Sequence, residues 1–122
     1  MNAFVAIVLI TVSGLRAAQA LTGDWGGAHV RLELGAKGGV IEFDCAHGEL
    51  SRALVPDKNG RFDVPGTFRQ EHGGPAQIDQ PPRPAWVRYT GRVMGDRLTL
   101  TVTRRGTFAL ERGKEPELVK CR

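Results

Sequence analysis

The sequence predicts an all-β protein: a small antiparallel up-and-down β-barrel of seven or eight strands, with a β-sandwich as the alternative. Beyond residue 20, apolar and polar residues alternate with a period of two, which is the pattern of strands with one buried face. Short segments rich in glycine, asparagine and aspartate interrupt this alternation at regular intervals, as turns do. No segment after residue 20 has the period of an amphipathic helix. Many short strands joined by tight turns are typical of small barrels and sandwiches.

The first twenty residues have the pattern of a cleaved secretory signal peptide. An apolar run, FVAIVLITV, precedes Ala18 and Ala20, which occupy the −3 and −1 positions of an A-x-A cleavage site. The run is shorter than the roughly 20 apolar residues of a membrane-spanning helix, so we expect no stable membrane insertion after cleavage. Because no Lys or Arg precedes Arg16, a buried N-terminal helix remains the alternative. We therefore expect a signal peptide at 1–20, a single β-barrel domain at 21–122, and a periplasmic or secreted protein.

The charge of the chain is mildly positive, and the distribution of basic residues does not favour a nucleic-acid partner. The chain has 17 Lys and Arg against 13 Asp and Glu, a net charge of +4, which becomes +3 once Arg16 is removed with the signal peptide. The basic residues are spread along the chain, and the aromatic residues do not alternate with them as a base-stacking surface requires. We expect no nucleic-acid partner.

Each predicted strand has one apolar face and one polar face. The inward-facing sets are Val30, Leu32 and Leu34; Ile41, Phe43 and Cys45; Phe62, Val64, Gly66 and Phe68; Val87, Tyr89, Gly91 and Val93; and Leu98, Leu100 and Val102. The sequence DKNG at 57–60 predicts a hairpin turn, because Asn-Gly readily adopts positive φ. Pro65 predicts a sheet edge or a bulge, because proline has no N–H for the ladder. The segments TFALER and ELVKC predict the last two strands.

One long interruption stands out as the candidate binding segment. EHGGPAQIDQPPRPA, residues 71–85, is rich in Pro and Gly and is longer than most connections in a compact domain, and such loops are often functional. We expect Trp86, Tyr89, Ile78 and His72 to surround an open barrel end there and to bind a ligand or partner. The alternative is that Trp86 only covers the edge of the core beneath the loop.

Cys45 and Cys121 are the two cysteines, and an even count in an exported chain favours one disulfide. The competing interpretation is a metal site made of Cys45 with His29, His47 and His72. Structural zinc sites usually contain two close ligand pairs, and this chain has one such pair and two distant histidines. A disulfide would also remove Cys45 from the ligand set. We expect the disulfide, with two free thiols as a further alternative, and no metal or other cofactor.

The start of the predicted domain resembles a known superfamily. TGDW, residues 22–25, is similar to the Gly-x-Trp signature that opens the first strand of the calycins, which include lipocalins, fatty-acid-binding proteins and avidins. The resemblance implies that Trp25 plugs one end of an up-and-down barrel. It also implies that Arg112, in ALERG, packs over the indole ring as a cation–π partner. The chain also looks like small secreted bacterial β-proteins that carry no assigned activity.

These observations together predict an exported, non-enzymatic binding protein that acts through the 69–86 loop and the adjacent strand ends. The calycin resemblance implies a carrier of a small apolar molecule. Its internal cavity would be lined by Leu32, Phe43, Phe62, Tyr89, Leu100 and Phe108. The alternative is an inhibitor of a secreted protease or lysozyme, with the loop as a protruding epitope. We expect no enzyme, because Ser51 has no nucleophile-elbow context and the carboxylates alternate on solvated strand faces; metal-dependent activity through the histidines is the lesser alternative.

Overall fold

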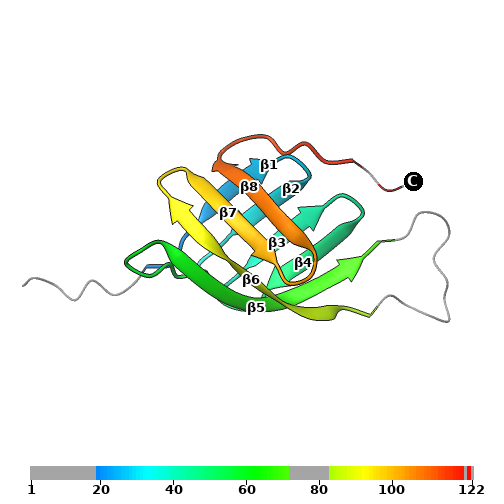
Figure 1. Cartoon of the computed structure of the whole chain (residues 1–122), viewed down its shortest axis with the longest axis horizontal. Helices are drawn as coiled ribbons and strands as arrows, with labels where there is room; N and C mark the ends of the chain where they lie inside the picture. The colour runs from blue at the N-terminus through cyan, green and yellow to red at the C-terminus, as the bar shows by residue number, and fades with distance from the viewer. Residues whose placement is uncertain (1–18, 72–82, 120, 122) are drawn as a thin grey trace, which may run out of the picture.

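The chain folds into a closed barrel of eight antiparallel strands in sequential order, as shown in the computed structural model in Figure 1. The structure describes residues 19–71, 83–119 and 121. The strands are β1 (Gly23–Gly27), β2 (Val30–Leu34), β3 (Gly39–Phe43), β4 (Ala46–Leu50), β5 (Arg61–Gln70), β6 (Ala85–Met94), β7 (Arg97–Val102) and β8 (Gly106–Arg112). Pairing of Trp25 with Arg112 and of Gly26 with Glu111 joins β8 to β1 and closes the barrel. The predicted all-β barrel is confirmed.

The alternation of apolar and polar residues determines which side of each strand faces the core. The residues at every second position of β2, β5 and β7 are buried, and those between them are exposed or half-buried. The core is one cluster made of Trp25, Val30, Leu32, Leu34, Ile41, Phe43, Ala46, Leu50, Leu54, Phe62, Val64, Phe68, Val87, Tyr89, Leu98, Leu100, Val102 and Leu110. A register shift of one residue in any strand would turn its apolar side chains toward solvent, so the sequence pattern fixes the register.

Aromatic rings fill the middle of the barrel because three inward-facing positions are glycine. A Cβ atom at Gly66 would lie 2.6 Å from Cε2 of Tyr89, and one at Gly48 would lie 2.3 Å from the Tyr89 hydroxyl oxygen. A Cβ atom at Gly91 would lie 2.9 Å from Cζ of Phe62. Side chains therefore occupy the centre of the barrel, as is usual for barrels of eight strands.

Three details of the strand predictions are corrected. The strand predicted to include Cys45 ends at Phe43, and Asp44 and Cys45 form the tight turn into β4, with Cys45 at φ 54°. The segment ELVKC contributes a single bridge, Glu117 to Ala28, in place of a strand. Pro65 lies in β5, which has neighbours on both sides, so β5 is not an edge strand.

Pro65 is tolerated because of where its backbone points. The Pro65 carbonyl accepts a hydrogen bond from the N–H of Ser51 at 2.9 Å, just beyond the end of β4. The nitrogen and the carbonyl of one strand residue point toward the same neighbouring strand, so the Pro65 nitrogen also faces β4. The ladder between β4 and β5 has ended there, because its last register pair is Leu50 with Gly66. The missing N–H therefore leaves no gap within the ladder.

The C-terminal residues run outside the barrel wall. We call residues 113–119 together with Cys121 the C-terminal strap. The Gly113 N–H donates to the Asp24 carbonyl at 2.8 Å, the Glu117 N–H donates to the Gly27 carbonyl at 3.1 Å, and the His29 N–H donates to the Glu117 carbonyl at 2.7 Å. The strap thus lies along β1, and it reaches the end of the barrel at which β1 ends.

The two ends of the barrel differ. Trp25 is 1% exposed, and the Arg112 guanidinium carbon lies 4.4 Å from the centre of its ring. The Arg112 side chain also donates to the Thr22 carbonyl at 3.0 Å and to the Asp96 carboxylate at 3.2 Å. The expected cation–π pair is confirmed, and it covers the end of the barrel at which β1 begins.

The predicted signal peptide lies outside the described residues, except for Gln19 and Ala20. Across residues 19–71 and 83–119 there is no helix with the length and apolar character needed to cross a membrane.

Candidate binding site at the barrel mouth

The turns β1–β2, β3–β4 and β7–β8, the end of β5 and the start of β6 all lie at the end of the barrel opposite to Arg112, because β1, β3, β5 and β7 run in the same direction. We call this end the barrel mouth. Figure 1 shows the end of β5 and the start of β6 extending past the other strands at this end. The mouth therefore gathers residues that are far apart in the sequence.

Three phenylalanines from three strands meet at the mouth. The ring centres of Phe43 and Phe68 are 5.5 Å apart, and those of Phe43 and Phe108 are 4.9 Å apart. The ring planes are tilted by 45° and 49°, and both centre-to-centre distances are within the range typical of aromatic pairs. The rings form the apolar floor of a recess of about 250 Å³.

Arg105, in the turn between β7 and β8, lies over this floor. Its guanidinium carbon is 4.3 Å from the centre of the Phe68 ring, which is within the range of a cation–π contact. Because the side chain is exposed, the guanidinium keeps N–H groups that can donate to a bound anion. The recess thus combines an aromatic floor with a cationic rim.

The rest of the rim is polar and held in place by hydrogen bonds. The carboxylate of Asp44 pairs with Nδ1 of His29 and also accepts a hydrogen bond from the Val119 N–H at 2.7 Å. The amide nitrogen of Gln70 donates to the Cys45 carbonyl at 3.1 Å. His29, Asp44, Gln70 and Ala46 complete the lining of the recess.

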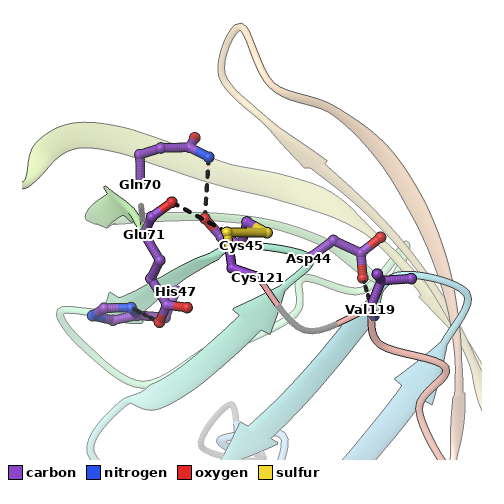
Figure 2. Close-up of a disulfide and its surroundings, with 7 residues drawn as sticks. All are labelled: Asp44, Cys45, His47, Gln70, Glu71, Val119 and Cys121. Carbon is purple, nitrogen blue, oxygen red and sulfur yellow. Dashed lines mark hydrogen bonds and ion pairs between the residues drawn. A yellow bond between two sulfur atoms is a disulfide. The ribbon is translucent and has the colours of Figure 1, made fainter. Parts of the chain in front are cut away.

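The disulfide expected from the sequence is present between Cys45 and Cys121, whose Cα atoms are 4.8 Å apart. Figure 2 shows it beside the mouth, with Asp44 and Val119 on one side and His47 and Glu71 on the other. The bond fixes the end of the C-terminal strap to the β3–β4 turn, and the hydrogen bond from Val119 to Asp44 continues the same attachment. A disulfide of this kind is typical of proteins outside the reducing cytoplasm.

A second, larger hollow of about 740 Å³ lies between the strap and the outer surface of β3 and β4. Its lining includes the carboxylates of Glu42, Glu49 and Glu71 and two exposed valines, Val40 and Val119. It follows the outside of the barrel wall and meets the aromatic recess at Phe43 and Ala46, which line both hollows. No other feature of the described residues indicates a ligand for it.

The structure describes two of the four predicted binding residues, Trp86 and Tyr89, and they lie in different surroundings. Trp86 is 80% exposed and points outward from β6, so it does not cover the core edge. Tyr89, expected beside the loop, lies in the centre of the core with 0% exposure, and its hydroxyl donates to the Thr67 carbonyl at 2.6 Å. Ile78 and His72 fall in 72–82, outside the described residues.

The six residues expected to line an internal cavity also fall into two groups. Phe43 and Phe108 line the recess at the mouth. The other four are packed in the core, each with an exposed fraction of 6% or less: Leu32, Phe62, Tyr89 and Leu100. Of these six residues, the two that a ligand can reach therefore lie at the mouth.

The members of the alternative metal set that the structure describes have other partners. Cys45 is in the disulfide, His29 pairs with Asp44, and Nδ1 of His47 lies 2.7 Å from the carboxylate of Glu71. In the part of the chain that the structure describes, no three His, Cys, Asp or Glu side chains come together as metal ligands.

Sequence analysis missed the grouping of Phe68 and Arg105 with Phe43 and Phe108. Alternation shows that Phe43 and Phe68 face inward, but it does not show that they lie at the same end of the barrel. The barrel order supplies this information, because the ends of β3 and β5 and the start of β8 meet at the mouth.

Searches against protein-family models, curated proteins and solved structures find no match to this chain.

Proposed function

We propose that this protein is an exported, non-enzymatic binding protein, and that its ligand is a small apolar or aromatic molecule carrying an anionic group, held in the recess at the barrel mouth. One observation carries the proposal: three phenylalanine rings form an apolar floor directly beneath the exposed guanidinium of Arg105. Ligand sites typically combine such an apolar surface with a few polar groups that fix orientation.

The size of the recess limits the ligand. At about 250 Å³, the recess is slightly below the usual range of small-molecule sites, roughly 300–1,000 Å³. The centre of the barrel is filled by Tyr89 and Phe62, so the ligand binds at the mouth and does not enter deeply. This differs from a carrier with a large internal cavity. The calycin-type arrangement of Trp25 and Arg112 at the other end supports a closed bottom and an open mouth, and we propose the calycin relationship on that basis.

A pair of fluorescent probes that share one aromatic skeleton tests the proposal. Anilinonaphthalene sulfonate carries an anionic group, and N-phenylnaphthylamine is its uncharged counterpart. We expect the folded protein to bind the sulfonate more tightly. We expect Arg105→Gln to weaken sulfonate binding roughly tenfold, the size of one charge-assisted hydrogen bond, and to leave the neutral probe almost unaffected.

The neighbouring arginine provides the matched control. Arg104 is exposed in the same turn but does not line the recess, so Arg104→Gln removes the same charge and should leave both affinities unchanged. Phe108→Ala should weaken both probes, because it removes part of the floor. Equal effects of the two arginine variants, or no effect of Phe108→Ala in a variant with unchanged near-UV circular dichroism, would contradict the proposal.

A second candidate function, inhibition of a secreted protease or lysozyme, is supported by the exposure of Trp86. An exposed tryptophan is unusual on a monomer surface, and tryptophan is enriched among the residues that dominate protein–protein binding energy. Trp86 is also the last residue of the 69–86 segment that we expected to contact a partner.

The test is a panel of extracellular serine proteases and lysozymes assayed with and without the protein. If one is inhibited, Trp86→Ala should raise the inhibition constant at least tenfold, as expected of a residue that dominates an interface. Met94→Ala is the control, because Met94 is an exposed apolar residue at the far end of the same strand. Absence of inhibition across the panel would count against this function.

A further inference from the structure

The outer surface of β5 and β6 carries a concentration of arginines. Side chains alternate along each strand, so the exposed arginines Arg61, Arg69, Arg88 and Arg92 all point away from the core. Asp63 is the one acidic residue on the outer face of these two strands, and its carboxylate pairs with Arg88 at 2.6 Å. These residues were spread along the sequence, and the pairing of β5 with β6 brings them onto one wall.

Arg61 and Arg92 are directly opposite each other in the β5–β6 register. Like charges at opposite positions destabilise a sheet. Arg92 donates from Nε to the Asn59 carbonyl at 3.1 Å, and among the described residues neither guanidinium is in an ion pair. Two cations held side by side can both donate to one carboxylate or sulfate group, and an anion bound there would also relieve their repulsion.

Threonine hydroxyls continue this surface across β7 and β8. Thr99 lies opposite Arg92, and Thr90, Thr101 and Thr107 form the next row. The hydroxyl oxygens of Thr101 and Thr107 are 3.0 Å apart. We call Arg61, Arg88, Arg92, Thr99, Thr101 and Thr107 the arginine–threonine face. Hydroxyl groups both donate and accept, so this part of the face suits a partner that is itself rich in hydroxyl groups.

The opposite wall of the barrel has the other sign. The outward-facing positions of β2, β3 and β4 include Glu33, Glu42 and Glu49. Arg31 is the one Lys or Arg on these three outer strand faces, and it pairs with Glu33, so an excess of negative charge remains. This separation of charge directs an anionic partner toward the arginine–threonine face and away from the glutamates.

We propose that the arginine–threonine face binds a linear acidic polysaccharide, a sugar polymer that carries carboxylate or sulfate groups. Guanidinium groups would hold the anionic groups, and threonine hydroxyls would bond the sugar hydroxyls. The face does not suit an acidic protein, because its centre is polar while the centre of a protein interface is usually apolar. It does not suit single-stranded nucleic acid, because Trp86 is the one exposed aromatic residue on the described outer surface of β5 and β6, and successive bases need successive rings.

Affinity electrophoresis and calorimetry with polygalacturonate, dextran sulfate and uncharged dextran test this proposal. We expect both acidic polymers to bind, more weakly as salt is raised, and uncharged dextran not to bind. The variant Arg61→Gln/Arg92→Gln should weaken binding roughly tenfold or more. The variant Arg31→Gln/Arg52→Gln loses the same net charge from exposed positions elsewhere and should weaken binding by less than roughly twofold.

Each outcome decides between specific binding and its alternatives. Equal weakening by the two double variants would show attraction to net charge alone and would overturn the proposal. Tighter binding of polythymidylate or polyglutamate than of polygalacturonate would also overturn it, in favour of nucleic acid or protein. Arg105→Gln should leave polysaccharide binding unchanged, so this proposal and the recess can fail independently. The near-UV circular dichroism of Arg61→Gln/Arg92→Gln should match that of the wild type, so that weaker binding reports the loss of these guanidinium groups and not a loss of fold.

Discussion

At the scale of single residues, Tyr89 shows how a polar group is kept in the core of this barrel. The ring occupies space left by Gly48 and Gly66, and the hydroxyl reaches the Thr67 carbonyl at 2.6 Å. Because the buried hydroxyl has this acceptor, little desolvation cost remains while the phenol is neutral. A charged phenolate at this position would lose its hydration without a group to replace it, and burial therefore raises the pKa of Tyr89.

Tyr89→Phe should lower the free energy of unfolding by about 1 kcal/mol near neutral pH, because it removes the hydrogen bond but keeps the ring. The wild type should also lose stability above about pH 10, where the unfolded chain ionises its phenol and the folded chain does not. Below that pH the phenol is neutral in both states, and its pKa shift has no effect. The variant lacks this contribution to the alkaline loss.

Tyr89 is the only tyrosine, so phenolate absorbance reports this residue alone. Urea unfolding between pH 8 and 11 measures the stability, and the absorbance change should coincide with unfolding. Phenolate absorbance in the folded protein near pH 10.5, before any loss of near-UV circular dichroism, would contradict the burial argument.

At the scale of elements, the C-terminal strap depends on a glycine in β1. A Cβ atom at Gly26 would lie 2.1 Å from the Lys114 carbonyl oxygen and 3.0 Å from the Pro116 nitrogen. These are backbone atoms of the strap, which is attached beyond this point by the disulfide. The strap follows β1 closely because position 26 has no side chain.

Gly26→Ala should therefore destabilise the protein by about 2 kcal/mol, since the strap must move away from β1. In the background Cys45→Ala/Cys121→Ala the strap is free to move, so the additional cost should fall below about 1 kcal/mol. Gly35→Ala is the control, because its Cβ would meet only the Gly38 carbonyl oxygen at 3.6 Å. Equal costs of Gly26→Ala in both backgrounds, measured by urea unfolding, would show that the disulfide does not hold the strap against β1.

The elements also show what the sequence could predict and why. Alternation identified the strands and their inward faces because burial of one face is a local constraint, as in β2 and β5. It did not identify the recess or the arginine–threonine face, because both depend on which strands are neighbours and where they end. Arg61 and Arg92 are 31 positions apart and become opposite only in the β5–β6 register. The end of β3 at Phe43 was missed because Cys45 continues the alternation while its backbone takes positive φ.

At the scale of the whole molecule, two closures act on the same chain. The ladder between β1 and β8 closes the barrel through backbone hydrogen bonds. The disulfide joins Cys45 to Cys121 across 76 positions and attaches the strap to the mouth. The first closure determines the fold, because every strand then has two neighbours. The second lies outside the ladder, so its contribution is to stability and to the mouth.

Removal of the disulfide in Cys45→Ala/Cys121→Ala should therefore lower stability strongly without abolishing the barrel. On the chain-entropy model, a closed loop of this length contributes up to about 4.5 kcal/mol, which is a large part of the roughly 5–15 kcal/mol typical of small domains. The native circular dichroism spectrum should persist, because the core cluster and the β1–β8 pairing do not include the strap.

Urea unfolding of the wild type with and without reductant measures the contribution of the disulfide to the free energy of unfolding, and the double variant should not respond to reductant. An unfolded double variant would show that the β1–β8 ladder alone cannot close the barrel. A stability loss below about 1 kcal/mol would show that the unfolded chain already holds the strap near Cys45.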